Sequence, residues 1–170
     1  MVNRRTLIAT VVALVVIGGA LYFLIPLPQT YTVYFVRDDG VTFSLQPVTR
    51  RGVFRTPADR AKLQIEALIA GPAESEAGLA TTIPAGATPL AIGYGAGELS
   101  VDFPAAIGEG GGTAQMLGRI NQLHFTLSET PEVSHVLLFV DGERITRFSS
   151  EGIIIDNPWQ RGDSRALPRW

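Results

Sequence analysis

The sequence contains no cysteine, and this absence excludes several classes of protein at once. A disulfide scaffold, a thiolate metal site, a cysteine nucleophile and a lipid-modified N-terminal cysteine all require a thiol. Charged residues are also scarce, at 18% of 170 residues with a net charge of −2, against roughly 25% in typical proteins. Because there is no long basic run, we do not expect a nucleic-acid partner held through phosphate contacts.

Residues suited to acid–base or metal chemistry are few. The two histidines, His124 and His135, have no second histidine or carboxylate at metal-ligand spacing, so no metal site is predicted. A hydrolase would need two carboxylates in a cleft, and the sequence offers Glu98 and Asp102. Alternation of outward polar residues on an antiparallel strand explains both equally well. We therefore predict no catalytic, cofactor-binding or metal-binding residues, and no enzyme.

Two further motifs have simpler explanations than function. Gly108 to Gly112 (GEGGG) precedes a predicted helix and could in principle cradle a phosphate. The GK[ST] signature of such loops is absent, so a flexible link is the better interpretation. The triplet Arg161-Gly162-Asp163 resembles an adhesion motif, but in a short arginine-containing tail chance explains it.

A long uncharged segment dominates the N-terminus. Residues 6–25 (TLIATVVALVVIGGALYFLI) carry no charge and follow the pair Arg4-Arg5. As a helix this segment would be about 30 Å long, the thickness of the hydrocarbon core of a bilayer. We predict a membrane anchor over residues 1–27, with the N-terminus cytoplasmic and the domain extracytoplasmic. A cleaved signal peptide is the alternative, with Gly18 and Ala20 as a poor cleavage site.

Residues 28–158 are expected to form one domain, followed by a flexible tail at 159–170. Patterns of alternating apolar residues around Gly-containing turns predict β-hairpins. They are expected at 31–36 with 41–48, at 90–94 with 99–103, and at 133–140 with 143–148, and residues 153–155 are expected to form a last short strand. Pro47 cannot donate to a ladder, so the strand that contains it is expected at a sheet edge.

Two helices are predicted between these hairpins. The first has Thr56 as its N-cap, with Pro57 at the first helical position and Asp59 where a capping-box carboxylate falls. The second is expected over residues 113–128. Its buried stripe includes Leu123, whereas Thr126 is expected to be less buried. We predict an α+β fold of mainly antiparallel hairpins with two helices packed on one face of the sheet.

Several segments, taken in order, resemble the GerM domain, also called the sporulation and spore germination domain, of bacterial envelope proteins. The segments are YTVYFVRDDG at 31–40, LIAGP at 68–72, GLATTIPAGA at 78–87, LSVDF at 99–103, TLSETPEVSHV at 126–136 and FVDGE at 139–143. The resemblance implies a small α+β domain outside the cytoplasmic membrane, similar to ring-building motifs of secretion and sporulation assemblies, with no established catalytic residues. This chain departs from the pattern by using a helix in place of a lipid anchor.

The expected function is a non-enzymatic assembly or scaffold component of the cell envelope, which associates with itself or with another envelope protein. A module that binds a cell-wall glycan or a small ligand is the alternative. Tyr94, Phe103 and Trp159 could supply stacking surfaces for such a ligand, although a place in the core explains these aromatic residues more simply.

Overall fold

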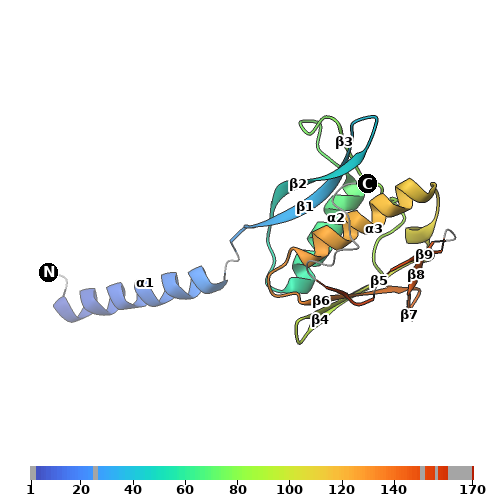
Figure 1. The fold of residues 1–170 in the computed structure, drawn as a ribbon. Coiled ribbons are helices and arrows are strands. Elements are labelled where there is room, and N and C mark those ends of the chain that lie inside the picture. Colours follow the sequence, from blue (N-terminus) through green and yellow to red (C-terminus); the bar gives the residue numbers. More distant parts are fainter. Residues whose placement is uncertain (1–2, 25–26, 150–151, 156, 161–169) are drawn as a thin grey trace.

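Two β-sheets enclose a pair of helices in this structure, a computed structural model that describes residues 3–24, 27–149, 152–155, 157–160 and 170 (Figure 1). The elements follow one another as α1 (Arg4–Leu24), β1 (Gln29–Asp38), β2 (Phe43–Gly52), α2 (Pro57–Ala70), β3 (Leu79–Ala80), β4 (Ala91–Gly95), β5 (Glu98–Phe103), the 3-10 helix η1 (Ala105–Gly108), α3 (Thr113–Ser128), β6 (His135–Val140), β7 (Glu143–Arg144), β8 (Arg147–Phe148), β9 (Ile153–Ile154) and β10 (Trp159–Gln160). The described chain thus mixes helices and strands, as the α+β prediction requires.

The first sheet has the strand order β2-β1-β3 and is antiparallel throughout. The expected first hairpin is confirmed: β1 and β2 pair along ten residues each. Gly40 adopts a φ of 82° in the connecting loop, and its N–H donates to Asp38 Oδ1 at 2.8 Å. Pro47 lies on β2, the outer strand, which confirms the expected edge position.

The second sheet has the order β10-β6-β5-β4, with β7 paired to β6. The predicted β4–β5 hairpin is confirmed, with Ala96 and Gly97 as its two turn residues. The pairing of β5 with β6, however, is parallel rather than antiparallel. Parallel neighbours need a long crossover connection, and α3 supplies it here. The described strand pairs are thus mainly antiparallel, as predicted, and β5 with β6 is a parallel pair that the sequence pattern did not indicate.

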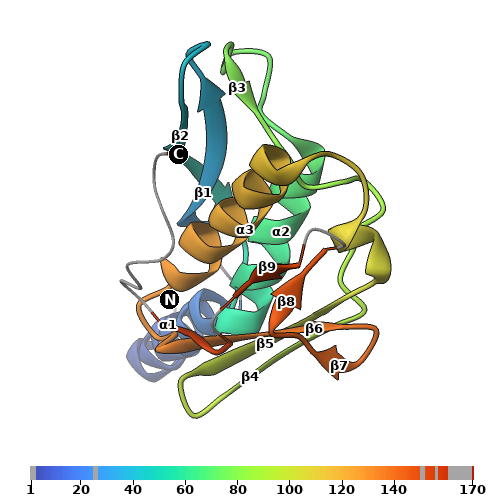
Figure 2. The ribbon, with the colours of Figure 1, turned by 45° about the vertical axis from the view of Figure 1, so that its right-hand side comes forward.

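Both helices lie between the two sheets, as Figure 2 shows. They share one core cluster with Phe35 of β1, Val101 of β5 and Leu138 of β6. The prediction that the helices pack on one face of a single sheet is therefore wrong. In the described ladders the β1–β2 and β4–β5 hairpins belong to different sheets, and β8 with β9 forms a third, two-stranded sheet.

The helix punctuation predicted from the sequence is confirmed. Thr56 accepts from the N–H of Asp59, and the Asp59 carboxylate accepts from the N–H of Thr56, which completes a capping box at the start of α2. Hydrogen bonds to its carboxylate from the Thr56 side chain and from the N–H groups of Arg55 and Thr56 lower the pKa of Asp59. α3 covers the expected residues 113–128. Leu123 is fully buried as expected, but so is Thr126, contrary to expectation.

The segment after β6 differs from the third predicted hairpin. The turn at Asp141 and Gly142 is present, but β7 is only two residues long. The expected strand 143–148 is divided into β7 and β8, and β8 pairs instead with β9. Trp159 and Gln160, expected at the start of a flexible tail, form β10 on the edge of β6.

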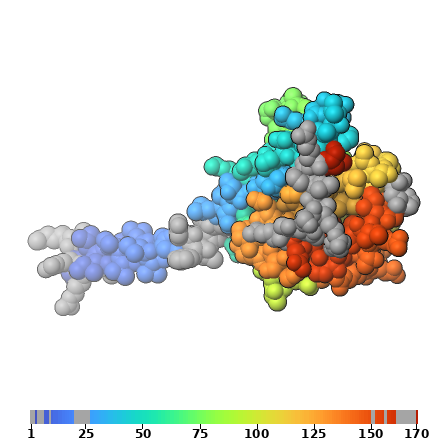
Figure 3. Space-filling model, in the orientation of Figure 1, coloured from blue at the N-terminus to red at the C-terminus, as the bar shows by residue number. Residues whose placement is uncertain are grey.

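α1 stands clear of the rest of the protein (Figure 3). Leu7, Val11, Leu14 and Val15 are each more than half exposed. Within the described part of the chain, no helix combines the length and the apolar character needed to cross a membrane. The helix predicted over residues 6–25 is therefore present as α1, and its passage through a bilayer is not shown.

Candidate assembly surface

The inner edge of β1 is closed by side chains of the two central helices. The Gln64 amide donates to the main-chain oxygens of Thr32 and Thr126 at 2.9 and 2.8 Å. The Tyr34 N–H donates to the Thr126 hydroxyl at 3.1 Å, and the Gln122 amide donates to the Tyr34 oxygen at 3.0 Å. The helix side chains occupy main-chain groups of Thr32 and Tyr34, and β3 pairs with β1 further along the same edge. This edge of β1 is therefore not open to a further strand.

A buried arginine holds the glycine-rich segment in place. Arg119 is only 2% exposed, and its guanidinium donates to the main-chain oxygens of Thr82, Ile107, Glu109 and Gly110 at 2.7–3.4 Å. Burial lowers the pKa of Arg119. The expectation of a slack link over residues 108–112 is thus corrected. Because the guanidinium is directed to these carbonyls, Arg119 serves as a structural clamp.

Glu98 and Asp102 are not placed as a hydrolase would need. Both lie on β5, four residues apart, which corresponds to about 13 Å along a strand. A glycosidase pair is separated by about 5–9.5 Å. Glu98 is exposed, whereas Asp102 accepts a hydrogen bond from the N–H of Gly142 at 3.0 Å. Asp102 therefore fixes the turn after β6, which explains a carboxylate at this position.

The two histidines are far from equivalent. His124 on α3 is buried, at 3% exposure, and its ring centroid lies 5.2 Å from that of Trp159. His135 begins β6 and lies opposite Glu98 in the parallel ladder. Among the described residues, no three histidine, aspartate or glutamate side chains gather into a group that could hold a metal ion.

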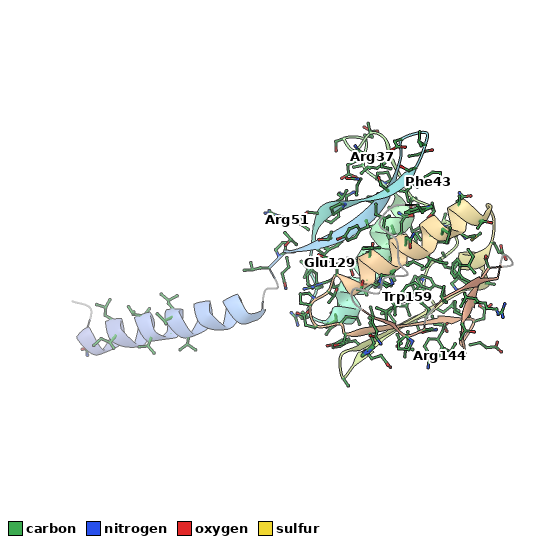
Figure 4. All side chains as sticks on the ribbon, in the orientation of Figure 1. Arg37, Phe43, Arg51, Glu129, Arg144 and Trp159 are labelled. Atoms are coloured by element: carbon green, nitrogen blue, oxygen red, sulfur yellow. The ribbon has the colours of Figure 1, made fainter. Side chains whose placement is uncertain are left out.

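The aromatic side chains considered for ligand stacking lie mainly in the core. Trp159, labelled in Figure 4, is 3% exposed and Phe103 is 1% exposed. Tyr94 alone of the three is partly open, at 38%, and its hydroxyl donates to the main-chain oxygen of Glu132 at 3.0 Å. A stacking platform for a glycan is therefore not assembled from these residues. The triplet Arg161-Gly162-Asp163 lies outside the described residues.

β4 is the strand whose outer edge is best suited to take a partner. In the described part of the chain it pairs with β5 alone. Gly95 and Glu98 close a two-residue turn and form a hydrogen-bonded pair, so alternate residues of β4 bond inward. Ile92 and Tyr94 then direct their main-chain N–H and C=O groups outward. Such an edge is a template for another strand.

A shallow groove runs beside this edge. It has a volume of about 300 Å³ and lies between the exposed side of α2 and the segment that enters β4. Lys62 and Glu66 border it on the helix, and Leu90 and Ile92 border it on the strand. Leu90 is 60% exposed. The groove combines apolar contacts with free main-chain groups, the two elements used in strand addition between a helix and a sheet edge.

Comparison with known proteins supports the resemblance seen in the sequence. Residues 32–146 match the family described as "Germane: Sporulation and spore germination". The chain is similar to the tandem GerMN domains of the sporulation protein GerM from Bacillus subtilis, with 22% identity and a TM-score of 0.63, over 78% of this chain and 45% of that chain. It therefore spans less than half the length of the tandem protein.

Two further solved structures have the same fold at lower identity. The first GerMN domain of GerM from Bacillus subtilis matches with 16% identity and a TM-score of 0.61, over 79% of this chain and 99% of that chain. A putative lipoprotein from Clostridium perfringens matches with 14% identity and a TM-score of 0.55, over 80% and 89%. No curated protein matches the chain. Because the family model matches most of the domain, the chain belongs to the Germane family of GerM-domain proteins, described as sporulation and spore germination.

Proposed function

We propose that the protein is a non-enzymatic assembly component of the bacterial cell envelope, held at the cytoplasmic membrane by residues 6–25 with its domain outside. In this proposal the domain works by pairing the edge of β4 with a strand of a second copy or of another envelope protein. The open edge of β4 is the observation that carries it.

The tether is supported by the sequence and by the surface of α1. Residues 6–25 have no charged side chain, and apolar residues such as Leu14 and Val16 are 64% exposed. Exposed apolar surface of this extent marks a site of interaction. The pair Arg4-Arg5 favours a cytoplasmic N-terminus. Tethering also confines copies to a plane and raises their effective concentration, so that a weak contact suffices for assembly.

The choice of β4 is supported by the state of the other edges. The inner edge of β1 is filled by Gln64, Gln122 and Thr126. The outer edge of β2 is interrupted by Pro47, which lacks an N–H, and proline at an edge discourages strand addition. β10 is only two residues long. β4 offers five residues with an apolar groove beside them.

Crosslinking in cells tests the proposal. A photoreactive amino acid at the exposed position Ala91 is expected to crosslink the full-length protein to a neighbour. Tyr94→Pro removes an outward N–H and should abolish this crosslink. Tyr94→Ala is the matched control, because it also removes the ring and the bond to Glu132 but keeps the N–H, and it should retain crosslinking.

Two results would contradict the proposal. Equal crosslinking in Tyr94→Pro and Tyr94→Ala, with both variants folded by circular dichroism, would show that the edge of β4 is not used. The double variant Glu98→Gln/Asp102→Asn should crosslink like the native protein. If this variant keeps its fold but no longer crosslinks, the carboxylates of Glu98 and Asp102 are needed for function, and the proposal is wrong.

A further inference from the structure

Trp170 is bound at the outer edge of the other sheet. The N–H of Phe43 donates to the main-chain oxygen of Trp170 at 2.9 Å, and the N–H of Trp170 donates to the oxygen of Phe43 at 3.0 Å. This reciprocal pair is the unit of an antiparallel ladder. Figure 2 shows the end of the chain, marked C, beside β2. The first residue of β2 thus already pairs with the main chain of Trp170.

The indole of Trp170 is held by specific contacts as well. Its ring stacks on that of Phe43, with centroids 5.9 Å apart and an interplanar angle of 23°. Its Nε1–H donates to the main-chain oxygen of Ala114 on α3 at 3.3 Å. Figure 4 labels Phe43 beside the end of α3 that this bond reaches. Stacking and a directed N–H bond together distinguish an indole from other apolar side chains.

Gly118 makes room for this ring. It lies inside α3, where glycine is destabilising relative to alanine. A Cβ at this position would lie 3.1 Å from Cζ2 of Trp170 and 3.1 Å from Cγ2 of Thr82. Ala114 and Gly118 are one helical turn apart and therefore share a face of α3. The close approach of the indole and of the Thr82 side chain thus explains a glycine in the middle of a helix.

We propose that Phe43, Thr82, Ala114 and Gly118 form a binding site for a tryptophan side chain carried on an extended peptide, and that Trp170 is its intramolecular ligand. The site is separate from the edge of β4, so it stands independently of the assembly proposed above. Pro47 interrupts the same edge four residues further along β2. Main-chain pairing is therefore restricted to the start of the strand, and the aromatic anchor supplies the selectivity.

The test uses the full-length chain in lipid nanodiscs and a synthetic peptide with the sequence of residues 166–170, Ala-Leu-Pro-Arg-Trp. Trp170→Ala empties the site, and the peptide should then shift the amide resonances of Phe43, Ala114 and Gly118. The same peptide with phenylalanine in place of tryptophan should bind more weakly, because it cannot donate to Ala114. The native chain should bind the tryptophan peptide at least about tenfold more weakly than the Trp170→Ala chain does, since its own Trp170 competes at a high effective concentration.

A second variant fills the site from the helix side. Gly118→Ala in the Trp170→Ala background should reduce peptide binding, whereas Gly112→Ala, where a Cβ would meet nothing within 4 Å, should leave it unchanged. In the native chain labelled with 5-fluorotryptophan, excess peptide should move the Trp170 resonance and leave that of the buried Trp159 in place.

The proposal is overturned if the peptide fails to bind a folded Trp170→Ala chain. It is also overturned if the phenylalanine and tryptophan peptides bind equally, because the Ala114 contact would then contribute no selectivity. Either result leaves the crosslinking at β4 unaffected, so the two proposals can fail separately.

Discussion

The side-chain amide of Gln122 donates a hydrogen bond of 3.0 Å to the main-chain oxygen of Tyr34, which joins the middle of α3 to the middle of β1. The other end of the same amide accepts from the N–H and the hydroxyl of Thr82 at 2.7 and 2.6 Å. Gln122 is fully buried. One side chain therefore satisfies main-chain groups of two separate segments in the interior.

Replacement of Gln122 by leucine should destabilise the domain although leucine is more apolar. The variant leaves the Tyr34 oxygen and the Thr82 N–H without partners, and one buried unpaired group costs about 1–3 kcal/mol. The free energy of unfolding from urea titration measures the loss. Gln115→Leu on the exposed side of the same helix is the control, and it should change stability by less than about 0.5 kcal/mol. Similar effects at both positions would contradict this assignment.

The hydroxyl of Thr126 should be needed to protect the inner edge of β1, where it accepts from the Tyr34 N–H. Thr126→Ala leaves the Tyr34 N–H without its acceptor, at a cost of about 1–3 kcal/mol, whereas Thr126→Ser keeps the oxygen. Amide hydrogen exchange at Tyr34 should become faster in the alanine variant alone. Equal exchange in the two variants would mean that the 3.1 Å contact does not protect this amide.

Leu123→Ala should be among the more damaging core substitutions. Leu123 is fully buried between the sheets, and removal of such a side chain costs about 2–5 kcal/mol through lost transfer free energy and the cavity left behind. Val41→Ala is the control, because Val41 is 90% exposed in the β1–β2 loop. A denaturant titration in which both variants unfold at the same midpoint would refute the placement of α3.

The ion pair between Arg50 and Glu76 should give the stability a specific dependence on pH. Arg50 and the N–H of Ala73 bind the Glu76 carboxylate, which lowers its pKa from 4.5 to about 2. A depressed pKa stabilises the folded state above the ordinary value of 4.5, and this contribution is lost as the pH falls towards 2. Glu76→Gln should flatten the profile of stability between these values.

The control for this profile is Glu74→Gln, which alters an exposed carboxylate two residues away. It should leave the dependence on pH unchanged. Urea midpoints at pH 7, 4 and 3 for the three proteins supply the measurement. If the Glu76 and Glu74 variants gave identical profiles, the pairing with Arg50 would not be the source of the effect.

The proposed tether predicts the orientation of the chain. A reporter that is active only outside the cytoplasm, fused after Trp170, should be active, because Arg4-Arg5 holds the N-terminus inside. Replacement of both arginines by glutamine should lower this activity. If only a reporter that works in the cytoplasm were active after Trp170, the domain would lie in the cytoplasm and the predicted orientation would be wrong.

The sequence contained the local features of the fold. Thr56, Pro57 and Asp59 identify the start of α2 because a capping box is written in consecutive residues. Gly97 and Gly142 identify two turns because each requires a positive φ, and both adopt it at 82° and 81°. These features depend on neighbours in the chain, so no knowledge of distant segments was needed.

The long-range features could not be predicted in the same way. The parallel pairing of β5 and β6 depends on where α3 delivers the chain, which alternating residues do not encode. Gln64 and Gln122 look like surface residues of amphipathic helices, because their partners on β1 are more than 30 residues distant. The contact of Trp170 with Gly118 joins residues with no shared sequence pattern.

The glutamine contacts also determine which packings of the interior are accessible. A core of leucine, isoleucine and valine tolerates shifted arrangements at small cost. If α3 slid past β1 by one residue, the helix would turn by about 100° to restore its apolar face, and Gln122 would no longer reach Tyr34. Gln64 would at the same time lose the Thr126 oxygen. These hydrogen bonds can therefore form in only one alignment of helix and strand. They select that alignment from the many that apolar packing alone would allow.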